Sequence, residues 1–187
     1  KKREVRAKYQ LPDHYILNVG SIEERKNALS AVQALMMLPE QIHLVIVGRH
    51  TEYTDKIERF IKENKLEERV HIISNVPFDD LPAFYQLAEI FVYPSRFEGF
   101  GIPIIEALYS GIPVVAATGS CLEEAGGPDS IYVDPDDIKG MADAFKQIYA
   151  DPERKKNMIE KGQIFAKRFA EEKQAEEILN IYKQLMK

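Results

Sequence analysis

Residues 89–113 read Glu89-Ile-Phe-Val-Tyr-Pro-Ser-Arg-Phe-Glu98-Gly-Phe-Gly-Ile-Pro-Ile-Ile-Glu106-Ala-Leu-Tyr-Ser-Gly-Ile-Pro113. The apolar run at its start predicts a buried strand, and residues 102–110 predict a helix with a proline in its first turn. The turn between them is therefore a helix N-terminus. Unpaired backbone N–H groups and the positive end of the helix dipole favour a phosphate or a cluster of sugar hydroxyls there. Gly99 and Gly101 would let such a ligand approach the backbone closely.

The alternation of strand and helix continues through the whole chain. Because strands that alternate with helices form parallel sheets with right-handed crossovers, we predict an α/β fold with a doubly wound parallel sheet of about six strands and C-terminal helices. Asp79 or Asp80 is expected to cap the helix over 78–87. The predicted strands cover 15–20, 43–48, 70–73, 89–93, 113–117 and 131–135, and the predicted helices cover 28–38, 54–64, 78–87, 102–110, 138–149, 152–168 and 171–186, after a lead-in helix and turn within 1–14.

Composition limits the classes of protein to which the chain can belong. Its 187 residues suit one domain with a full hydrophobic core, and 45% hydrophobic with 29% charged residues is typical of a soluble globular protein. No apolar run reaches membrane-spanning length, and the net charge of -5 argues against nucleic acid as the main partner. Cys121 is the single cysteine, which we interpret as an ordinary loop side chain in a protein of a reducing cytoplasm.

A second anion site is predicted on the first strand-turn-helix unit. Arg25 and Lys26 lie between the strand over 15–20 and the helix that follows it. Taken alone, such a pair could be two solvated charges near a helix start. In open α/β sheets, however, ligands bind at the carboxyl ends of the strands, so these cations and the turn around Glu98 would share one rim. The strand ends expected on that rim are Gly20, Gly48, Ile73, Tyr93 and Ala117.

Other catalytic signatures are missing from the sequence. There is no Gly-x4-Gly-Lys-Ser and no Gly-x-Gly-x-x-Gly after the first strand, which removes the usual support for nucleotide hydrolysis and dinucleotide redox chemistry. The two cations, the helix N-terminus and the two carboxylates of the rim would complement a nucleoside diphosphate sugar, whose diphosphate suits the cations and whose hydroxyls suit the carboxylates. No metal is expected, because no histidine stands in a metal-ligand spacing with the cysteine or a carboxylate cluster. The histidines are His14, His43, His50 and His71.

The central turn also carries a longer motif. Glu98 and Glu106 are separated by seven residues within Pro94-Ser-Arg-Phe-Glu-Gly-Phe-Gly-Ile-Pro-Ile-Ile-Glu-Ala107, and Gly111-Ile-Pro-Val-Val115 follows. This pattern resembles the signature of retaining glycosyltransferases of family 4, also called group 1, in the nucleotide-sugar-binding half of a GT-B fold. Two glutamates at this spacing occur by chance in many helical proteins, whereas the extended motif is far more specific. The resemblance covers the chain from Tyr15 onward.

The resemblance implies a role for each carboxylate. Glu98 would contact the transferred sugar, and Glu106, one turn into the helix, would bind the ribose hydroxyls. Whether Glu98 is also a covalent nucleophile stays open. In one interpretation of retaining enzymes the acceptor attacks from the face that the diphosphate leaves, and catalysis then consists of stabilising that leaving group. The backbone expected to hold the sugar and the distal phosphate belongs to Gly99, Phe100, Gly101 and Ile102.

The resemblance also assigns roles to the other strand ends. Arg25 and Lys26 would act on the departing diphosphate, because Ser21 stands where many family members carry a basic residue. The loop after the third strand would either contact the nucleobase through the backbone of Asn75 and Val76 or form a plain connection. The predicted donor contacts on the first two strand ends are Ser21 and Gly48.

Residues 1–187 are interpreted as one donor-binding domain, because nothing in them matches the N-terminal acceptor domain of a GT-B enzyme. We expect this fragment to be inactive without that domain. The variant Gly-Ser-x-Glu-x-Arg-Lys-Asn resembles mannosyltransferases of surface-polysaccharide assembly, which favours GDP-mannose over a UDP-sugar and a glycan or lipid-linked acceptor. The expected location is cytoplasmic, with any contact to the inner face of the membrane made by the missing domain.

Two other classes of function stay open. One is a non-catalytic module that binds a nucleotide sugar on the same fold. The other is a different GT-B enzyme, such as a sugar-nucleotide epimerase or a phosphorylase. The intact set of Glu98, Glu106, Arg25 and Lys26 favours the transferase over both.

Overall fold

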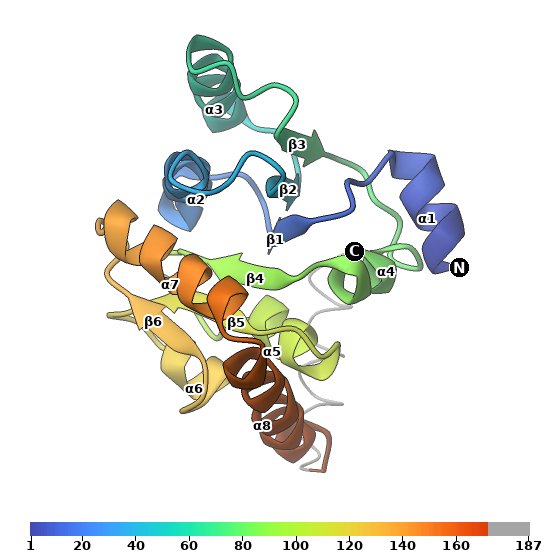
Figure 1. The fold of residues 1–187 in the computed structure, drawn as a ribbon, viewed down its shortest axis with the longest axis vertical. Coiled ribbons are helices and arrows are strands. Elements are labelled where there is room, and N and C mark those ends of the chain that lie inside the picture. The colour runs from blue at the N-terminus through green and yellow to red at the C-terminus, as the bar shows by residue number, and fades with distance from the viewer. Residues whose placement is uncertain (172–187) are drawn as a thin grey trace.

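The computed structural model describes residues 1–171 and shows a six-stranded parallel sheet between two layers of helices (Figure 1). The strand order is β3-β2-β1-β4-β5-β6, and every neighbouring pair is parallel. The predicted doubly wound α/β fold is confirmed. The strands are β1 (Tyr15–Val19), β2 (His43–Val47), β3 (Val70–Ile73), β4 (Ile90–Tyr93), β5 (Val114–Ala117) and β6 (Ile131–Val133).

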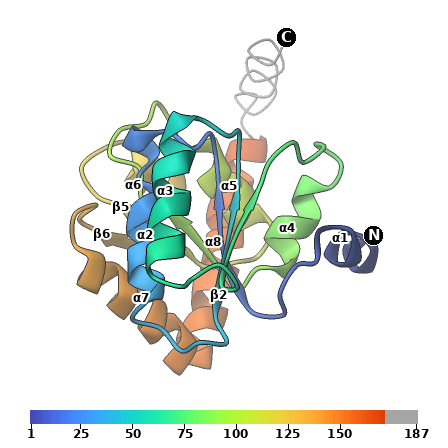
Figure 2. The same cartoon turned by 90° about the horizontal axis from the view of Figure 1, so that it is seen from above.

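The central strands are apolar on both faces because helices cover both sides of the sheet. Ile16 of β1 packs into one hydrophobic cluster, and its neighbour Leu17 packs into the other on the opposite face. In Figures 1 and 2, α2 and α3 lie on one side of the sheet, and α1 and α4 lie on the other. The first layer contains α2 (Ala28–Leu35), α3 (Glu52–Glu63) and α7 (Ile138–Ala150), and the second contains α1 (Lys2–Tyr9), α4 (Leu81–Leu87), α5 (Ile102–Tyr109), α6 (Leu122–Gly126) and α8 (Pro152–Glu171).

Two helices are three residues shorter than predicted, because side chains or backbone groups at those ends interact with distant segments. The helix predicted to reach Leu38 ends at Leu35. The Arg69 guanidinium donates hydrogen bonds to the carbonyl oxygens of Leu35, at that end, and of Leu38, just beyond it. The helix predicted over 78–87 begins at Leu81, and Asp80 makes no side-chain cap. The helix predicted over 152–168 continues to Glu171, and residues 172–186 of the helix predicted over 171–186 lie outside the described residues.

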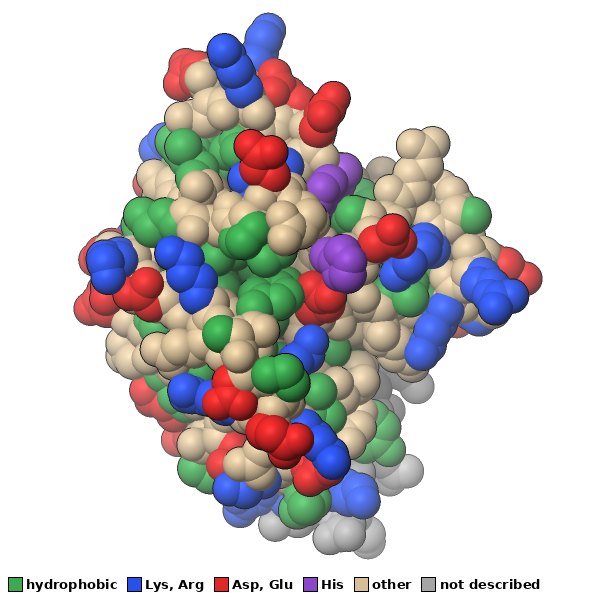
Figure 3. Space-filling model, viewed as in Figure 1, with side chains coloured by type: hydrophobic (Ala, Val, Ile, Leu, Met, Phe, Trp, Pro, Cys, Tyr) green, Lys and Arg blue, Asp and Glu red, His purple; other side chains and the backbone are tan. Residues whose placement is uncertain are grey.

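Asp80 instead anchors α1 to the second layer. Its buried carboxylate accepts hydrogen bonds from Lys8 and Tyr9 at 2.8 and 2.9 Å and pairs with Lys1 at 2.8 Å. These donors hold the pKa of Asp80 well below its usual range. Lys and Arg side chains gather over this N-terminal helix on the face shown in Figure 3. Within residues 1–171, no helix has the length and apolar character needed to cross a membrane.

The sheet topology places the candidate site. The strand order reverses between β1 and β4, which lie side by side at the centre of the sheet. In a doubly wound sheet this switch point opens a crevice at the carboxyl ends of the strands. The segments that follow β1 and β4 carry Lys26 and Glu98, so the predicted cations and the first carboxylate meet there.

Candidate active site

Glu98 is the centre of a compact charged cluster at the switch point. Its Oε1 lies 2.5 Å from Lys26 Nζ and accepts a hydrogen bond from Ser95 Oγ at 2.9 Å. Arg25 Nη1 lies 3.7 Å from the same oxygen. The Glu98 and Lys26 side chains are only 10% and 15% exposed, so their attraction is screened less than that of a surface pair. The predicted grouping of two cations and a carboxylate is therefore present in the free chain.

Asn27 holds the two cations against this turn. The basic pair lies in a 3₁₀ turn, Glu24–Lys26, and Asn27 ends that turn in the left-handed conformation with φ 60. Its Nδ2 donates to Pro94 O at 3.1 Å and to Pro135 O at 3.0 Å, which links the segments after β4 and β6. Sequence reasoning missed this residue. An asparagine directly after a basic pair was the available signal, since asparagine adopts the left-handed region more readily than most side chains.

Arg25 and Ser21 are engaged by protein groups in the free chain. Arg25 donates to Phe97 O and to Glu23 Oε2, both at 3.1 Å, while 48% of its side chain stays exposed. Ser21 Oγ donates to the other Glu23 oxygen at 2.9 Å. This bond, followed by attraction to Arg25, lowers the pKa of Glu23. Ser21 thus helps to fix the carboxylate that restrains Arg25, a role that the sequence did not predict.

Tyr93, the last residue of β4, forms the wall behind the cluster. Lys26 Nζ lies 3.2 Å from the Tyr93 hydroxyl and 5.5 Å from the centre of its ring. Burial, with the neighbouring Glu98 carboxylate, raises the pKa of this tyrosine above its usual range. Tyr93 is therefore neutral at physiological pH and leaves Glu98 as the negative partner of Lys26.

The turn that follows Glu98 combines an open position with a tightly packed one. A Cβ at Gly99 would meet no atom within 4 Å, whereas a Cβ at Gly101, which has φ 88, would lie 3.1 Å from the Leu122 side chain. Gly101 is the N-cap of α5, so the positive end of that helix dipole lies directly after the Glu98 turn, while the Ile104 N–H already donates to Gly101 O at 3.0 Å. Cys121, expected to be an ordinary loop side chain, borders this turn, since its Sγ lies 3.1 Å from Glu98 O and 3.0 Å from Gly99 O.

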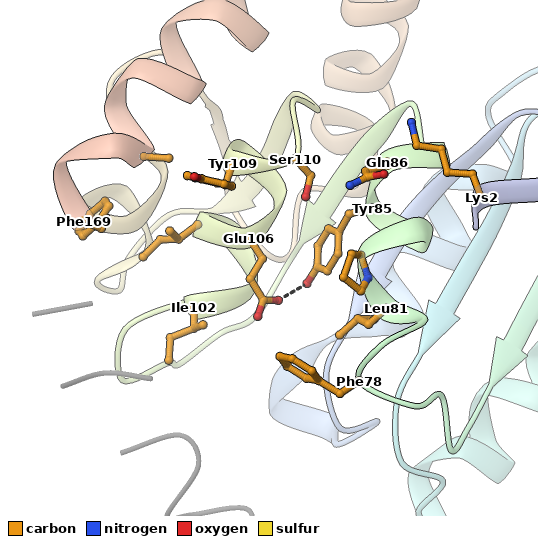
Figure 4. A pocket seen from close by; sticks show the side chains of 13 residues that line it. Lys2, Phe78, Leu81, Tyr85, Gln86, Ile102, Glu106, Tyr109, Ser110 and Phe169 are labelled. Carbon is orange, nitrogen blue, oxygen red and sulfur yellow. Dashed lines mark hydrogen bonds between the residues drawn. The ribbon is translucent and has the colours of Figure 1, made fainter. Parts of the chain in front are cut away.

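Glu106 lies apart from the charged cluster, on the wall of a cavity of about 800 Å³ between α4 and α5 (Figure 4). The Tyr85 hydroxyl donates to Glu106 Oε2 at 2.7 Å. Burial raises the pKa of Glu106, and the Tyr85 hydrogen bond opposes this rise. The cavity is mostly apolar, with Phe78 and Leu81 on the α4 side and Ile102 on α5. The cavity can hold a flat ring, and the Glu106 carboxylate at its wall can accept hydrogen bonds from hydroxyl groups.

The other predicted donor contacts occupy the β2 and β3 ends of the rim. Gly48 is required by packing, because a Cβ there would lie 1.8 Å from Gly20 O. Ser74 Oγ donates to Gly48 O at 2.9 Å and joins the two segments. Asn75 is exposed with φ 58, while Val76 packs against the hydrophobic cluster of the second layer. Their contacts to a nucleobase stay predictions.

The expectation that no histidine lies near a group of carboxylates was wrong for His50. His50 lies close to two carboxylates, since its Nε2 is 3.4 Å from Asp55 and 3.9 Å from Glu58. The sequence did not show this proximity because His50 precedes α3 and the carboxylates lie on its first turns. Among residues 1–171 this is the one group of three or more such side chains with ligand atoms within 4.8 Å of one another, and all three are exposed.

Comparison with known proteins places this geometry in a family. An O-antigen chain mannosyltransferase B of Escherichia coli is 33% identical over 186 residues, which cover 97% of this chain and 49% of that protein. The O-antigen chain mannosyltransferase RfbU of Salmonella typhimurium is 33% identical over 141 residues, 75% of this chain and 40% of that protein. The chain thus spans about half the length, or less, of these relatives.

Solved structures share the fold. A sucrose-phosphate synthase from Thermosynechococcus elongatus aligns with a TM-score of 0.82 and 28% identity over 98% of this chain and 49% of its own. The C-terminal domain of a group 1 glycosyl transferase, LpcC, from Francisella tularensis aligns with a TM-score of 0.76 and 19% identity over 90% of this chain and 92% of its own. Residues 1–165 match the family described as glycosyl transferases group 1. Because that match takes in both the Lys26 segment and the Glu98–Glu106 motif, the chain belongs to the group 1 glycosyl transferase family.

Proposed function

We propose that this chain is the donor-binding domain of a retaining, family 4 glycosyltransferase that moves a hexose from a nucleoside diphosphate sugar to a glycan or lipid-linked acceptor. The observation that carries the proposal is the cluster of Lys26, Arg25 and Glu98 at the N-terminus of α5. The acceptor domain would be a separate N-terminal part of the whole protein. The chain itself supplies the groups that bind and activate the donor.

Activation of the donor would depend on stabilising the leaving diphosphate. As the bond between the sugar and the diphosphate breaks, negative charge grows on the phosphate oxygens. Lys26 and Arg25 both lie at Glu98, next to the N-terminal end of α5, and together with the backbone of that turn they would hold that charge. Once the donor has displaced Glu98 from Lys26, these cations would already be in place when the charge develops, which limits reorganisation at the moment of reaction. Glu98 would accept hydrogen bonds from hydroxyls of the transferred sugar.

The cavity between α4 and α5 would bind the nucleoside. Glu106 would accept the ribose hydroxyls, and the apolar side chains around it would cover the base. Asn75 and Val76 would contact the edge of the base from the loop after β3. The distinct surroundings of the two carboxylates support this division, since Glu98 lies among cations and Glu106 lies in an apolar pocket.

We further propose mannose as the sugar and GDP-mannose as the donor. Two relatives at 33% identity carry the name O-antigen chain mannosyltransferase, which supports both the sugar and a polysaccharide acceptor. No metal is included in this proposal, because the described donors at the site are cations, hydroxyls and backbone N–H groups that suit a diphosphate directly.

Calorimetric titration of the chain with GDP, UDP, ADP, GDP-mannose and UDP-glucose tests the proposal. One base should bind selectively, and Lys26→Ala should weaken that binding by roughly 10- to 100-fold, the cost of one charge-assisted hydrogen bond. Lys139→Ala is the matched control, because Lys139 pairs with Asp143 on the exposed side of α7. Equal binding by the two variants, or no binding by a folded wild-type chain, would contradict the proposal. Epimer formation by the whole protein without acceptor would instead support an epimerase.

A further inference from the structure

Tyr85 lies between the hydrophobic core and the cavity between α4 and α5. It belongs to α4, is 2% exposed, and its ring packs against Phe91 of β4 with 5.5 Å between ring centres. Its hydroxyl crosses the space between the helices and donates to Glu106 Oε2 at 2.7 Å (Figure 4). The ring is therefore held by the core while the hydroxyl lies at the wall of the cavity.

This hydrogen bond has a direct effect on what Glu106 can bind. An ionised carboxylate offers about four lone-pair positions, and Tyr85 uses one of them on Oε2. The remaining positions can accept two hydroxyl groups of a vicinal diol. Without the tyrosine hydroxyl, the carboxylate would rotate about its terminal torsion, which is broad for glutamate. Tyr85 thus fixes the plane of the group that meets the ligand.

We infer that Tyr85 is a positioning residue for the ribose of the donor: it holds the Glu106 carboxylate in the orientation that accepts the 2′- and 3′-hydroxyls together. This inference rests on the proposed function, since it assumes a nucleoside in the cavity. It adds a residue on a different helix, α4, to the recognition of the ribose. The sugar diol, rather than the base or the diphosphate, is the part of the ligand that depends on it.

The electrostatic surroundings support this assignment. Burial raises the pKa of Glu106, and the hydrogen bond from Tyr85 is the group that opposes the rise. The other titratable side chains that line the cavity among residues 1–171 are Lys2 from α1 and Tyr109 from α5. Neither shifts the pKa of Glu106 in the described structure. Loss of the Tyr85 hydroxyl would therefore leave the carboxylate in an apolar place without its donor.

The test compares GDP with 2′,3′-dideoxy-GDP by calorimetry in wild type and Tyr85→Phe, with UDP and its dideoxy form as a second pair. The substitution keeps the ring and its packing. We expect Tyr85→Phe to weaken GDP binding about tenfold and to leave the weaker binding of dideoxy-GDP unchanged. We also expect the pH below which GDP binding is lost to rise in Tyr85→Phe, because the pKa of Glu106 increases further.

Tyr15→Phe is the matched control. Tyr15 is also buried, and its hydroxyl donates to Phe84 O of the same helix at 2.6 Å, so the variant loosens α4 without touching Glu106. It should bind GDP as wild type does. The inference would be overturned if Tyr85→Phe weakened the binding of GDP and of dideoxy-GDP by the same factor, or if it left GDP binding unchanged. If wild type binds neither diphosphate, or Glu106→Ala binds like wild type, the proposed function fails and the inference fails with it.

A measurement on the unaltered chain covers the case in which Tyr85→Phe does not fold. A crystal structure with bound GDP, or with UDP if only UDP binds, should keep the Tyr85 hydroxyl on Glu106 while the other positions of the carboxylate meet both ribose hydroxyls. A complex in which the carboxylate leaves Tyr85, or in which the ribose lies elsewhere, would overturn the inference.

Discussion

Gly48 offers a sharp test of how the rim is built. The backbone of Gly20 crosses so close to it that an alanine Cβ would lie 1.8 Å from Gly20 O and 2.8 Å from Gly20 C. Both are backbone atoms, which have no side-chain torsion through which to move aside. Gly48→Ala therefore forces the segment after β1 away from β2 by more than an ångström, since non-bonded heavy atoms prefer separations of about 3.5 Å.

The cost follows from the bonds that hold this segment. Gly20 N–H donates to Val47 O at 2.9 Å, and Ile22 N–H donates to Arg49 O at 3.2 Å. Loss of one of these bonds costs about 1 kcal/mol, and overpacking adds roughly 1 to 3 kcal/mol. We expect Gly48→Ala to lower the free energy of unfolding by about 3 kcal/mol. For a domain of this size that corresponds to a fall in Tm of roughly 6 to 12 °C.

Thermal unfolding followed by circular dichroism measures this fall, and Gly99→Ala is the control. A Cβ at Gly99 meets no atom within 4 Å, so its Tm should stay within about 2 °C of wild type. Under the proposed function, Gly99→Ala should nevertheless weaken binding of a nucleoside diphosphate sugar, because its methyl group would enter the space proposed for the ligand. A Tm for Gly48→Ala within 2 °C of wild type would refute the packing argument.

Three further predictions concern stability. His43 and His71 stack with Nδ1 and Nε2 2.9 Å apart, and burial lowers the pKa of both, so the folded chain binds fewer protons than the unfolded one. The free energy of unfolding should therefore fall as pH decreases from about 6.5 through the lowered pKa values. His71→Gln should show a shallower fall in unfolding scans between about pH 7.5 and 5. The same dependence on pH in both proteins would contradict this. Asn27→Ala should lower the free energy of unfolding in urea by about 2 to 4 kcal/mol, because it removes two hydrogen bonds and puts alanine at φ 60. Asn27→Gly should recover about 1 kcal/mol of this loss. Equal losses in the two variants would exclude a backbone contribution. Asp80→Asn should speed hydrogen exchange in α1 above about pH 4, and the difference from wild type should shrink progressively as the pH falls from there towards the lowered pKa of Asp80, where the carboxylate is protonated. Unchanged exchange would show that α1 does not depend on this anchor.

The strands and the charged rim could be predicted from the sequence because both depend on local patterns. Each predicted strand corresponds to an observed one, since short apolar runs ended by glycine or a turn leave little alternative in a parallel sheet. Lys26 and Glu98 could be brought together from topology alone, because parallel strands end on the same edge. The family motif then linked Glu106 to the same ligand.

The parts that could not be predicted depend on contacts between distant segments. The end of α2 is set by Arg69, and the start of α4 by the pairing of Asp80 with α1. No local pattern reports either interaction. The same holds for Asn27, which joins two loops, and for Tyr85, which meets Glu106 across a cavity. Such residues look like ordinary members of a turn or an amphipathic helix until the fold is known.

The pair of Lys26 and Glu98 has a consequence for ligand discrimination. Bare cations at a helix N-terminus would attract many small anions, such as free phosphate or carboxylates. Here Glu98 is already paired with Lys26, with 2.5 Å between the charged atoms, so a ligand has to compete with this carboxylate for the lysine. A ligand gains from displacing it only if it satisfies both halves, with phosphate oxygens for the lysine and hydroxyl groups for the released glutamate. Under the proposed function, this pair would disfavour simple anions and favour a molecule that carries both a diphosphate and a sugar.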